Sequence, residues 1–280
     1  MILPVYTQVS KEARIFCADL SEDVFHYPFF NDGVEQCLLK ESGFFELTES
    51  IARRFDEGKN LRIKGFIFHT SHCGSTLLGR MLDQCSDIRV VSEPEVINGL
   101  LLAYTLNECD RKTVLSKLKT VINVYCQSAN EGKHVIFKFT SWNIFMADLF
   151  RELFPEVKRM YIDRPTGKCV ESLVRSNGGM QQWYFHGSDI LRKHFVGNQP
   201  NPLSFQEYLK ILVDNHRSSA EMKLSQLDLK VCYPDFIQKF ESHICPHFEI
   251  EISQEEREKI IEQTRYDAKS LEPILFTDQN

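Results

Sequence analysis

The chain has 280 residues, of which 42% are hydrophobic and 26% are charged, and its formal net charge is −6. This length suits one large α/β domain, or a core with an added subdomain, and we expect the single domain. The acidic balance excludes the global basic field that holds nucleic acid or an anionic membrane, so neither is predicted as a partner. Any anionic ligand must therefore be held by local groups.

The nine cysteines are an odd number and form no C-x-x-C pair, which is typical of free thiols in a reducing compartment. The first six residues do not resemble a signal peptide, and the longest apolar stretch, around residues 100–106, is too short to cross a bilayer. These features predict a soluble cytoplasmic protein, and they leave its oligomeric state open.

Residues 1–60 form a phenylalanine-rich, weakly patterned segment that we expect to cover the core. One helix is predicted in it, from Val34 to Arg54. Glu57 to Asn60 have the composition of a turn that leads into the first strand of the core.

The stretch from Ile63 to Leu78 organises the rest of the chain. Apolar residues are followed by a small glycine-containing turn and then by apolar residues at helical spacing, which predicts a buried strand, a tight loop and an amphipathic helix. Gly74 lets the backbone approach a ligand, and the helix start offers free N–H groups beside the hydroxyls of Ser75 and Thr76. This pattern favours a phosphate or sulfate group. The simpler alternative is that both hydroxyls only cap the helix.

The loop is not a Walker motif. That motif needs a lysine directly before the hydroxyl residue, whereas Gly74 precedes Ser75 here, and His69 stands where the early glycine would be. An ordinary ATPase is therefore disfavoured.

Further strands and helices are predicted to alternate along the remaining chain. The other strands are expected at 88–92, 134–138, 158–162 and 229–233. The helices are expected near 96–107, 111–129, 142–154, 166–175 and 204–224, with two more after the last strand. This alternation predicts an α/β fold with a doubly wound, mainly parallel sheet of about five strands flanked by helices.

The predicted organisation is a single domain, residues 1–280, with four parts. They are the covering segment at 1–60, a cofactor-binding core at 61–176, a substrate lid and helix at 177–225, and a C-terminal strand with helices at 226–280.

Ligands of such sheets bind beyond the carboxyl ends of the strands. His72, Glu93, Lys138 and Arg164 each end or follow one of the first four strands, so they are predicted to share one rim. The aromatic segment from Gln181 to Phe195 is expected to form a lid.

In this combination the chain resembles the PAPS-dependent sulfotransferases, a P-loop-like family that moves a sulfuryl group from 3′-phosphoadenosine 5′-phosphosulfate (PAPS) to an acceptor. The resemblance runs in order from about residue 62 to 176, and more faintly to 270. Residues Cys73 to Leu78 resemble the family's S-G-T-T-x-L loop, which holds the 5′-phosphosulfate.

The segment from Leu153 to Pro165 resembles the family's second motif, in which an arginine follows a strand. Ser172 follows Arg164 by eight residues, and the family uses an arginine and a serine at this spacing to grip the 3′-phosphate. Arg164 is a bidentate donor at a strand end, and Ser172 lies about two helical turns further on, facing back. The alternative is an ordinary surface ion pair and a helix-face hydroxyl.

The resemblance implies PAPS as co-substrate and no metal. It implies that the cofactor is bound by His72, Cys73, Gly74, Ser75, Thr76, Leu77, Arg164 and Ser172, and Lys269 in the C-terminal segment is a further candidate. The family usually has lysine or arginine where His72 stands, and its C-terminal glycine-rich motif has no obvious match here. Thr264 to Lys269 could supply substitute contacts, although a tail helix with surface charges is the alternative.

Glu93, in its Ser-Glu-Pro setting, and Lys138 resemble catalytic residues of tyrosylprotein-type members. The resemblance implies that Glu93 accepts the acceptor's proton and that Lys138 stabilises the negative charge that develops on the bridging oxygen. His72 is the third catalytic candidate, and His69 and His134 are weaker candidates for the base. The alternatives are a carboxylate at a helix N-terminus and a solvated strand-end lysine.

The leading hypothesis is a sulfotransferase acting on a hydroxyl or amine of a small-molecule, sugar or peptide acceptor. A divergent phosphotransferase with Asp163 as a metal-binding residue is the rival enzyme, and a nucleotide-binding module without catalysis is the third candidate. Trp183, Tyr184, His186 and Phe195 suggest an aromatic entrance that suits sugars, phenols and peptides alike.

Two groups of residues invite a metal interpretation, namely His69, His72 and Cys73, and His243, Cys245 and His247. Neither shows the ligand count or spacing of zinc signatures, so no metal site is predicted.

Overall fold

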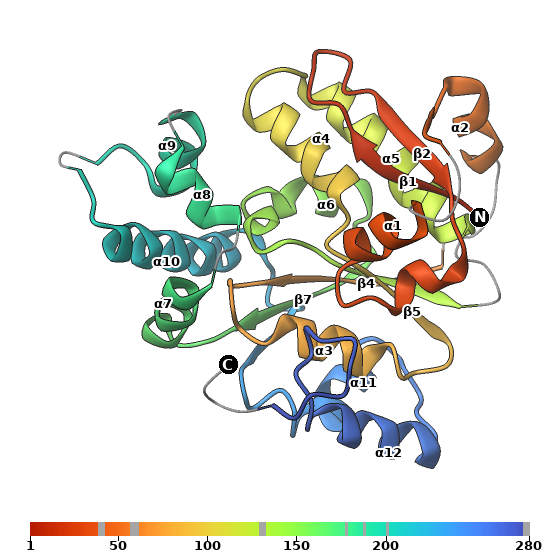
Figure 1. Cartoon of the computed structure of the whole chain (residues 1–280), viewed down its shortest axis with the longest axis vertical. Coiled ribbons are helices and arrows are strands. Elements are labelled where there is room, and N and C mark those ends of the chain that lie inside the picture. The colour runs from red at the N-terminus through yellow and green to blue at the C-terminus, as the bar shows by residue number, and fades with distance from the viewer. Residues whose placement is uncertain are drawn as a thin grey trace.

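The computed structural model describes residues 1–38, 43–56, 62–128, 133–176, 179–186, 189–199 and 202–276. Its main sheet has five strands in the spatial order β5-β6-β4-β7-β8, and every neighbouring pair is parallel (Figure 1). The strands are β4 (Ile63–His69), β5 (Ile88–Ser92), β6 (His134–Lys138), β7 (Lys158–Asp163) and β8 (Leu229–Cys232). The predicted α/β class and parallel sheet are confirmed.

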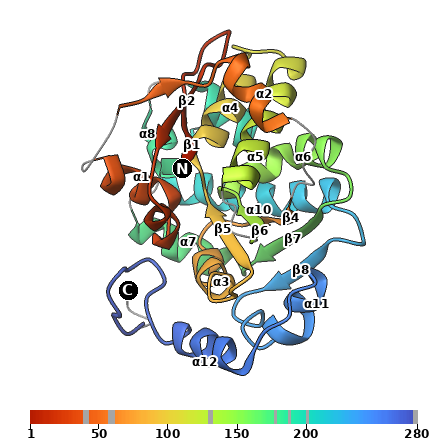
Figure 2. The ribbon, with the colours of Figure 1, turned by 90° about the vertical axis from the view of Figure 1, so that its right-hand side faces the viewer.

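Helices connect the strands and cover both faces of the sheet. They are α3 (Ser75–Leu82), α4 (Glu95–Thr105), α5 (Arg111–Ser128), the 3-10 helix η2 (Ser141–Met146), α6 (Ala147–Leu153), α7 (Thr166–Arg175), α8 (Gly179–Phe185), α9 (Asp189–Val196), α10 (Phe205–Lys223), the π-helical turn η3 (Phe240–Ile244), α11 (Cys245–His247) and α12 (Gln254–Gln263). Figures 1 and 2 show α4, α5 and α6 on one face, and α3, α11 and α12 on the other.

The sheet is buried on both faces, and this explains why its strands are continuously apolar. In β4, Phe66 and Phe68 belong to the core under α4, α5 and α6, whereas Ile67 belongs to the core shared with α3 and α12. Successive side chains of a strand point to opposite faces, so one strand serves two cores. The ends of the strands are thereby held in fixed positions.

The N-terminal segment differs from the prediction. It forms an antiparallel sheet of β1 (Ile2–Thr7), β2 (Ile15–Asp19) and β3 (Phe45–Glu46), together with the 3-10 helix η1 (Glu22–His26), α1 (Phe30–Leu38) and α2 (Glu49–Asp56). The single helix expected from Val34 to Arg54 is wrong, because Phe45 and Glu46 pair with β2 in the middle of that range. The turn predicted at 57–60 lies outside the described residues.

Two other segments also depart from expectation. The helix predicted at 142–154 is divided into η2 and α6. The tail helix considered for Thr264 to Lys269 is wrong, because α12 ends at Gln263 and Tyr266 pairs with Leu275 in a loop that runs back past α3 (Figures 1 and 2). Over the described ranges, none of the helices has the length and apolar composition needed to cross a membrane.

Candidate functional site

The carboxyl ends of four parallel strands bring the predicted residues to one rim. The Glu93 N–H donates to the Lys138 carbonyl at 2.7 Å, which joins the ends of β5 and β6. The Arg164 guanidinium, just after β7, donates from Nη1 to the carbonyl of His72 at 3.0 Å, which joins it to the loop after β4. The structure therefore places four residues together at the carboxyl ends of the strands, namely His72, Glu93, Lys138 and Arg164.

We call residues 72–76 the cradle loop. Gly74 has a φ of 83°, and a β-carbon there would lie 2.5 Å from Cδ2 of Tyr233, which follows β8. Only glycine tolerates this positive φ and also leaves room for the Tyr233 ring. Helix α3 begins directly after it at Ser75, so the hydroxyls of Ser75 and Thr76 and the N–H groups of the first turn are at the rim. Such an arrangement can bind an anion.

His72 joins the cradle loop to α7. Its Nδ1 lies 2.8 Å from Oγ of Ser172, and its Nε2 lies 3.4 Å from Oγ of Ser176. Burial, followed by the charges of Lys269 and Arg164, lowers the pKa of His72 to about 4. The imidazole is therefore neutral at physiological pH. Ser172 does face back toward the cradle loop.

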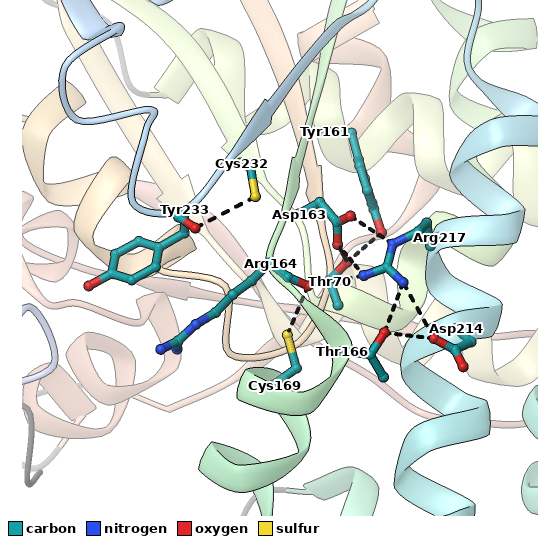
Figure 3. Close-up of polar contacts among 10 residues, drawn as sticks. All are labelled: Thr70, Tyr161, Asp163, Arg164, Thr166, Cys169, Asp214, Arg217, Cys232 and Tyr233. Atoms are coloured by element: carbon teal, nitrogen blue, oxygen red, sulfur yellow. Dashed lines mark hydrogen bonds and ion pairs between the residues drawn. The ribbon is translucent and has the colours of Figure 1, made fainter.

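Arg164 extends from the end of β7 alongside Tyr233 (Figure 3). Its guanidinium carbon lies 4.9 Å from the centroid of the Tyr233 ring. Among the described residues, the bond to the His72 carbonyl is the one hydrogen bond of this guanidinium. Because a guanidinium carries five N–H donors, most of them remain available to a ligand.

Lys138 and Glu93 form a buried pair. Lys138 is 0% exposed and donates from Nζ to Oε1 of Glu93 and, at 3.0 Å, to Oγ of Ser92. A solvated strand-end lysine is therefore ruled out. Burial raises the pKa of Glu93, but the ammonium of Lys138 opposes it through both its charge and its hydrogen bond, and the net shift is downward. Glu93 is a carboxylate at neutral pH, with 21% of its side chain exposed, and can accept a proton.

The structure distinguishes between the two weaker candidates for the base. His69 ends β4, and its Nε2 lies 3.8 Å from Oε1 of Glu93. Burial and the charge of Lys138 lower the pKa of His69 to about 4. His134 begins β6 and pairs with Ile88 at the start of β5. It therefore lies at the amino ends of these strands, whereas Lys138 lies at their carboxyl ends. This placement removes His134 as a candidate.

Asp163 is held in an ion pair. Arg217 on α10 donates from Nε to Oδ2 at 2.7 Å and from Nη2 to Oδ1 at 3.0 Å, and Thr70 donates to Oδ1 at 3.0 Å (Figure 3). Sequence reasoning considered this carboxylate a metal ligand only under the rival phosphotransferase hypothesis, and it missed Arg217. No local pattern could have shown the pair, because the two residues come from β7 and from a helix much later in the chain.

Three other residues are predicted to bind the cofactor, and they lie in the cradle loop, in α3 and in the loop after α12. Cys73 is fully buried in the same core as α3, and burial raises the pKa of its thiol. Leu77 packs against the core that contains α3. Lys269 is exposed, and its charge contributes to lowering the pKa of both His72 and Glu93, so the loop after α12 brings it toward the rim.

The expected aromatic entrance is a packed cluster. The rings of Trp183 and Phe195 stack with centroids 4.8 Å apart, and both contact Trp142 of η2. Phe195 is 1% exposed, and the Tyr184 hydroxyl donates to the Leu203 carbonyl. These residues therefore pack α8 and α9 against η2 and the segment that precedes α10.

Neither histidine–cysteine group forms a metal centre. Over the described ranges, no three histidine, cysteine, aspartate or glutamate side chains converge as ligands.

Comparisons with known proteins give structural relatives alone. No protein-family model and no curated sequence matches the chain. A sulfotransferase from Alicyclobacillus acidocaldarius aligns with a TM-score of 0.42 and 14% identity, over 72% of this chain and 90% of its own. A mouse sulfotransferase in complex with PAP aligns with a TM-score of 0.40 and 14% identity, over 78% of this chain and 69% of its own. The structure is thus similar to solved sulfotransferases over most of its length, at low sequence identity.

Proposed function

We propose that this protein is a sulfotransferase that moves a sulfuryl group from PAPS to a hydroxyl or amine acceptor. The observation that carries the proposal is the buried pair of Glu93 and Lys138 on the same rim as the cradle loop. A carboxylate that stays ionised can deprotonate a nucleophile, and an adjacent ammonium can stabilise negative charge on a leaving group.

The rim suits a ligand with two anionic ends. The N–H groups and hydroxyls at the start of α3 can bind one end, and Arg164 and Ser172 lie beside the cradle loop and can hold the other. In PAPS these ends are the 5′-phosphosulfate and the 3′-phosphate. PAPS would supply the sulfuryl group and leave as adenosine 3′,5′-bisphosphate.

The residues of the chain divide the remaining work. Glu93 accepts the proton that the acceptor's oxygen or nitrogen loses as it attacks sulfur. Lys138 donates to Glu93 and Ser92 with two of its three N–H groups, which orients the carboxylate before reaction. Protonation of Glu93 weakens its pairing with Lys138, and this makes the ammonium charge more available to the leaving oxygen.

No specific observation favours the phosphotransferase alternative. The carboxylate that it requires, Asp163, is bound by Arg217 and Thr70. A nucleotide-binding module without catalysis predicts the same binding as the sulfotransferase and is separated from it by turnover alone.

The test is transfer of label from radiolabelled PAPS to a panel of alcohols, phenols, amines and sugars, with Glu93→Gln as the control and EDTA present throughout. Transfer by the parent and its loss in the variant are expected. Binding of the bisphosphate without any transfer would identify a nucleotide-binding module. In a parallel assay with magnesium and without EDTA, magnesium-dependent transfer of phosphate from ATP would establish the phosphotransferase instead.

A further inference from the structure

We infer that Arg217 on α10 is a positioning residue that sets the orientation of Arg164, and thereby the preference for a ligand carrying a 3′-phosphate. This inference rests on the proposed function, because it assigns Arg164 to that phosphate. The juxtaposition that carries it is the convergence of Arg217 on the turn between β7 and α7 (Figure 3).

The Arg217 guanidinium makes five contacts with this turn and its own helix. Nε and Nη2 donate to the two oxygens of Asp163 at 2.7 and 3.0 Å, and Nη2 also donates to the carbonyl of Arg164 at 3.0 Å. Nη1 donates to Oγ1 of Thr166 at 2.9 Å and to Oδ1 of Asp214 at 3.4 Å. These bonds account for the donor capacity of a guanidinium. Arg217 therefore acts on a ligand through its neighbours.

These contacts fix the backbone on both sides of the Arg164 α-carbon. The preceding residue is held through its carboxylate, and the carbonyl of Arg164 itself is held by Nη2 and, at 3.5 Å, by the thiol of Cys169. Pro165 follows with its φ restricted by the ring, and Thr166 begins α7. The direction in which the Arg164 side chain leaves the turn is thus set largely from α10.

Within the described ranges, the side chain of Arg164 itself has two restraints, the bond to the His72 carbonyl and the contact with the Tyr233 ring. Without Arg217, the turn can rotate and the guanidinium can leave the position from which it reaches a phosphate. Displacements of about 1 Å in a binding group are enough to weaken an oriented, bidentate contact.

Helix α10 is a suitable anchor because it is packed along its length. It contacts α7, α8, α9 and η2, and Asn215 donates from Nδ2 to the Phe195 carbonyl at 2.7 Å. Lys223 on the same helix provides a matched control. It donates to Asp148 and to the Phe145 carbonyl, which ties α10 to α6 and η2 without contacting the β7–α7 turn.

The experiment compares two ligands by calorimetry, adenosine 3′,5′-bisphosphate and adenosine 5′-phosphate, on the parent, Arg217→Gln and Lys223→Gln. Arg217→Gln should weaken the bisphosphate roughly 3–30-fold and leave the 5′-phosphate nearly unchanged, so the preference between the two falls. Lys223→Gln should leave the preference intact. A merely structural role would lower both affinities together and keep their ratio.

A double-mutant cycle tests whether Arg217 acts through Arg164. In an Arg164→Ala background, Arg217→Gln should cause no further loss of bisphosphate affinity. Additive losses, or an unchanged preference in Arg217→Gln, would overturn the inference and leave the proposed function standing. If Arg217→Gln does not fold, Arg217→Lys serves in its place, because lysine keeps the charge but cannot bind Asp163 and the Arg164 carbonyl as a fork. A parent without any preference for the bisphosphate overturns the proposed function as well.

Discussion

Nδ1 of His72 lies 2.8 Å from Oγ of Ser172, so a hydrogen bond between side chains links the cradle loop to α7. His72 is the position at which the sequence departs from the sulfotransferase pattern, and Ser172 is expected to hold a phosphate. A ligand at Ser172 therefore meets a neutral imidazole rather than a fixed positive charge.

This linkage predicts that bisphosphate binding depends on pH. The pKa of His72 is about 4 in the free protein, and an adjacent phosphate should raise it by favouring the imidazolium. Between the free and the complexed pKa, affinity should rise as pH falls, and it should weaken as pH rises through the complexed value. Calorimetry from about pH 5.5 to 8.5 measures the slope, and His72→Arg should flatten it. Equal slopes in parent and variant would remove His72 from direct contact.

Glu93→Gln should lower turnover by roughly 10²–10⁴-fold, because the amide cannot accept the acceptor's proton. It also leaves the buried Lys138 ammonium without its counter-charge, so a loss of stability of about 3 kcal/mol is expected. The double variant Glu93→Gln with Lys138→Met removes both charges and is the matched control. It should recover melting temperature without recovering activity. A single variant with parental turnover would show that another group is the base.

Gly74→Ala should destabilise the fold by about 1–3 kcal/mol and weaken the bisphosphate. The added β-carbon meets the Tyr233 ring at 2.5 Å, and a φ of 83° is strained for alanine. Gly167→Ala is the control, because a β-carbon there has nothing within 4 Å and no positive φ. In a helix this change should be neutral or stabilising by up to about 1 kcal/mol. Similar melting temperatures for the two variants would contradict the role of Gly74.

The buried histidines predict sensitivity to acid. Burial is the leading cause that lowers the pKa of His69 to about 4 and that of His216 to about 3. An unfolded histidine titrates near 6.5, so the unfolded chain binds more protons between about pH 6.5 and 4. The free energy of unfolding should therefore decrease as pH falls through this window. Urea denaturation at several pH values measures the slope, and His216→Phe should reduce it. A flat profile over the window would contradict the neutral, buried state of these rings.

Much of the main sheet could be predicted from the sequence, because its strands are apolar runs with clear boundaries. The rule that parallel strands present ligands at their carboxyl ends then placed Glu93 and Lys138 together. Their direct pairing and the complete burial of Lys138 depend on packing by Phe29, which precedes α1, and by Gly79 of α3, and could not be read locally.

The failures have a common physical origin. The helix expected from Val34 to Arg54 is interrupted because pairing with β2 overrides local helix propensity. No local pattern singles out Arg217 in the sequence, because only the fold brings it to Asp163. The loop that carries Lys269 is likewise defined by a contact between Tyr266 and Leu275 rather than by its composition.

The packing of Tyr233 on Gly74 has a consequence for the order in which the protein folds on the ribosome. The cradle loop is synthesised early, but the residue that covers it follows the last strand of the sheet. A nascent chain that ends before β8 leaves the outer edge of β7 unpaired, and such an edge can recruit strands from other chains. Competence to bind a nucleotide should therefore appear late in synthesis, when β8 docks and closes that edge.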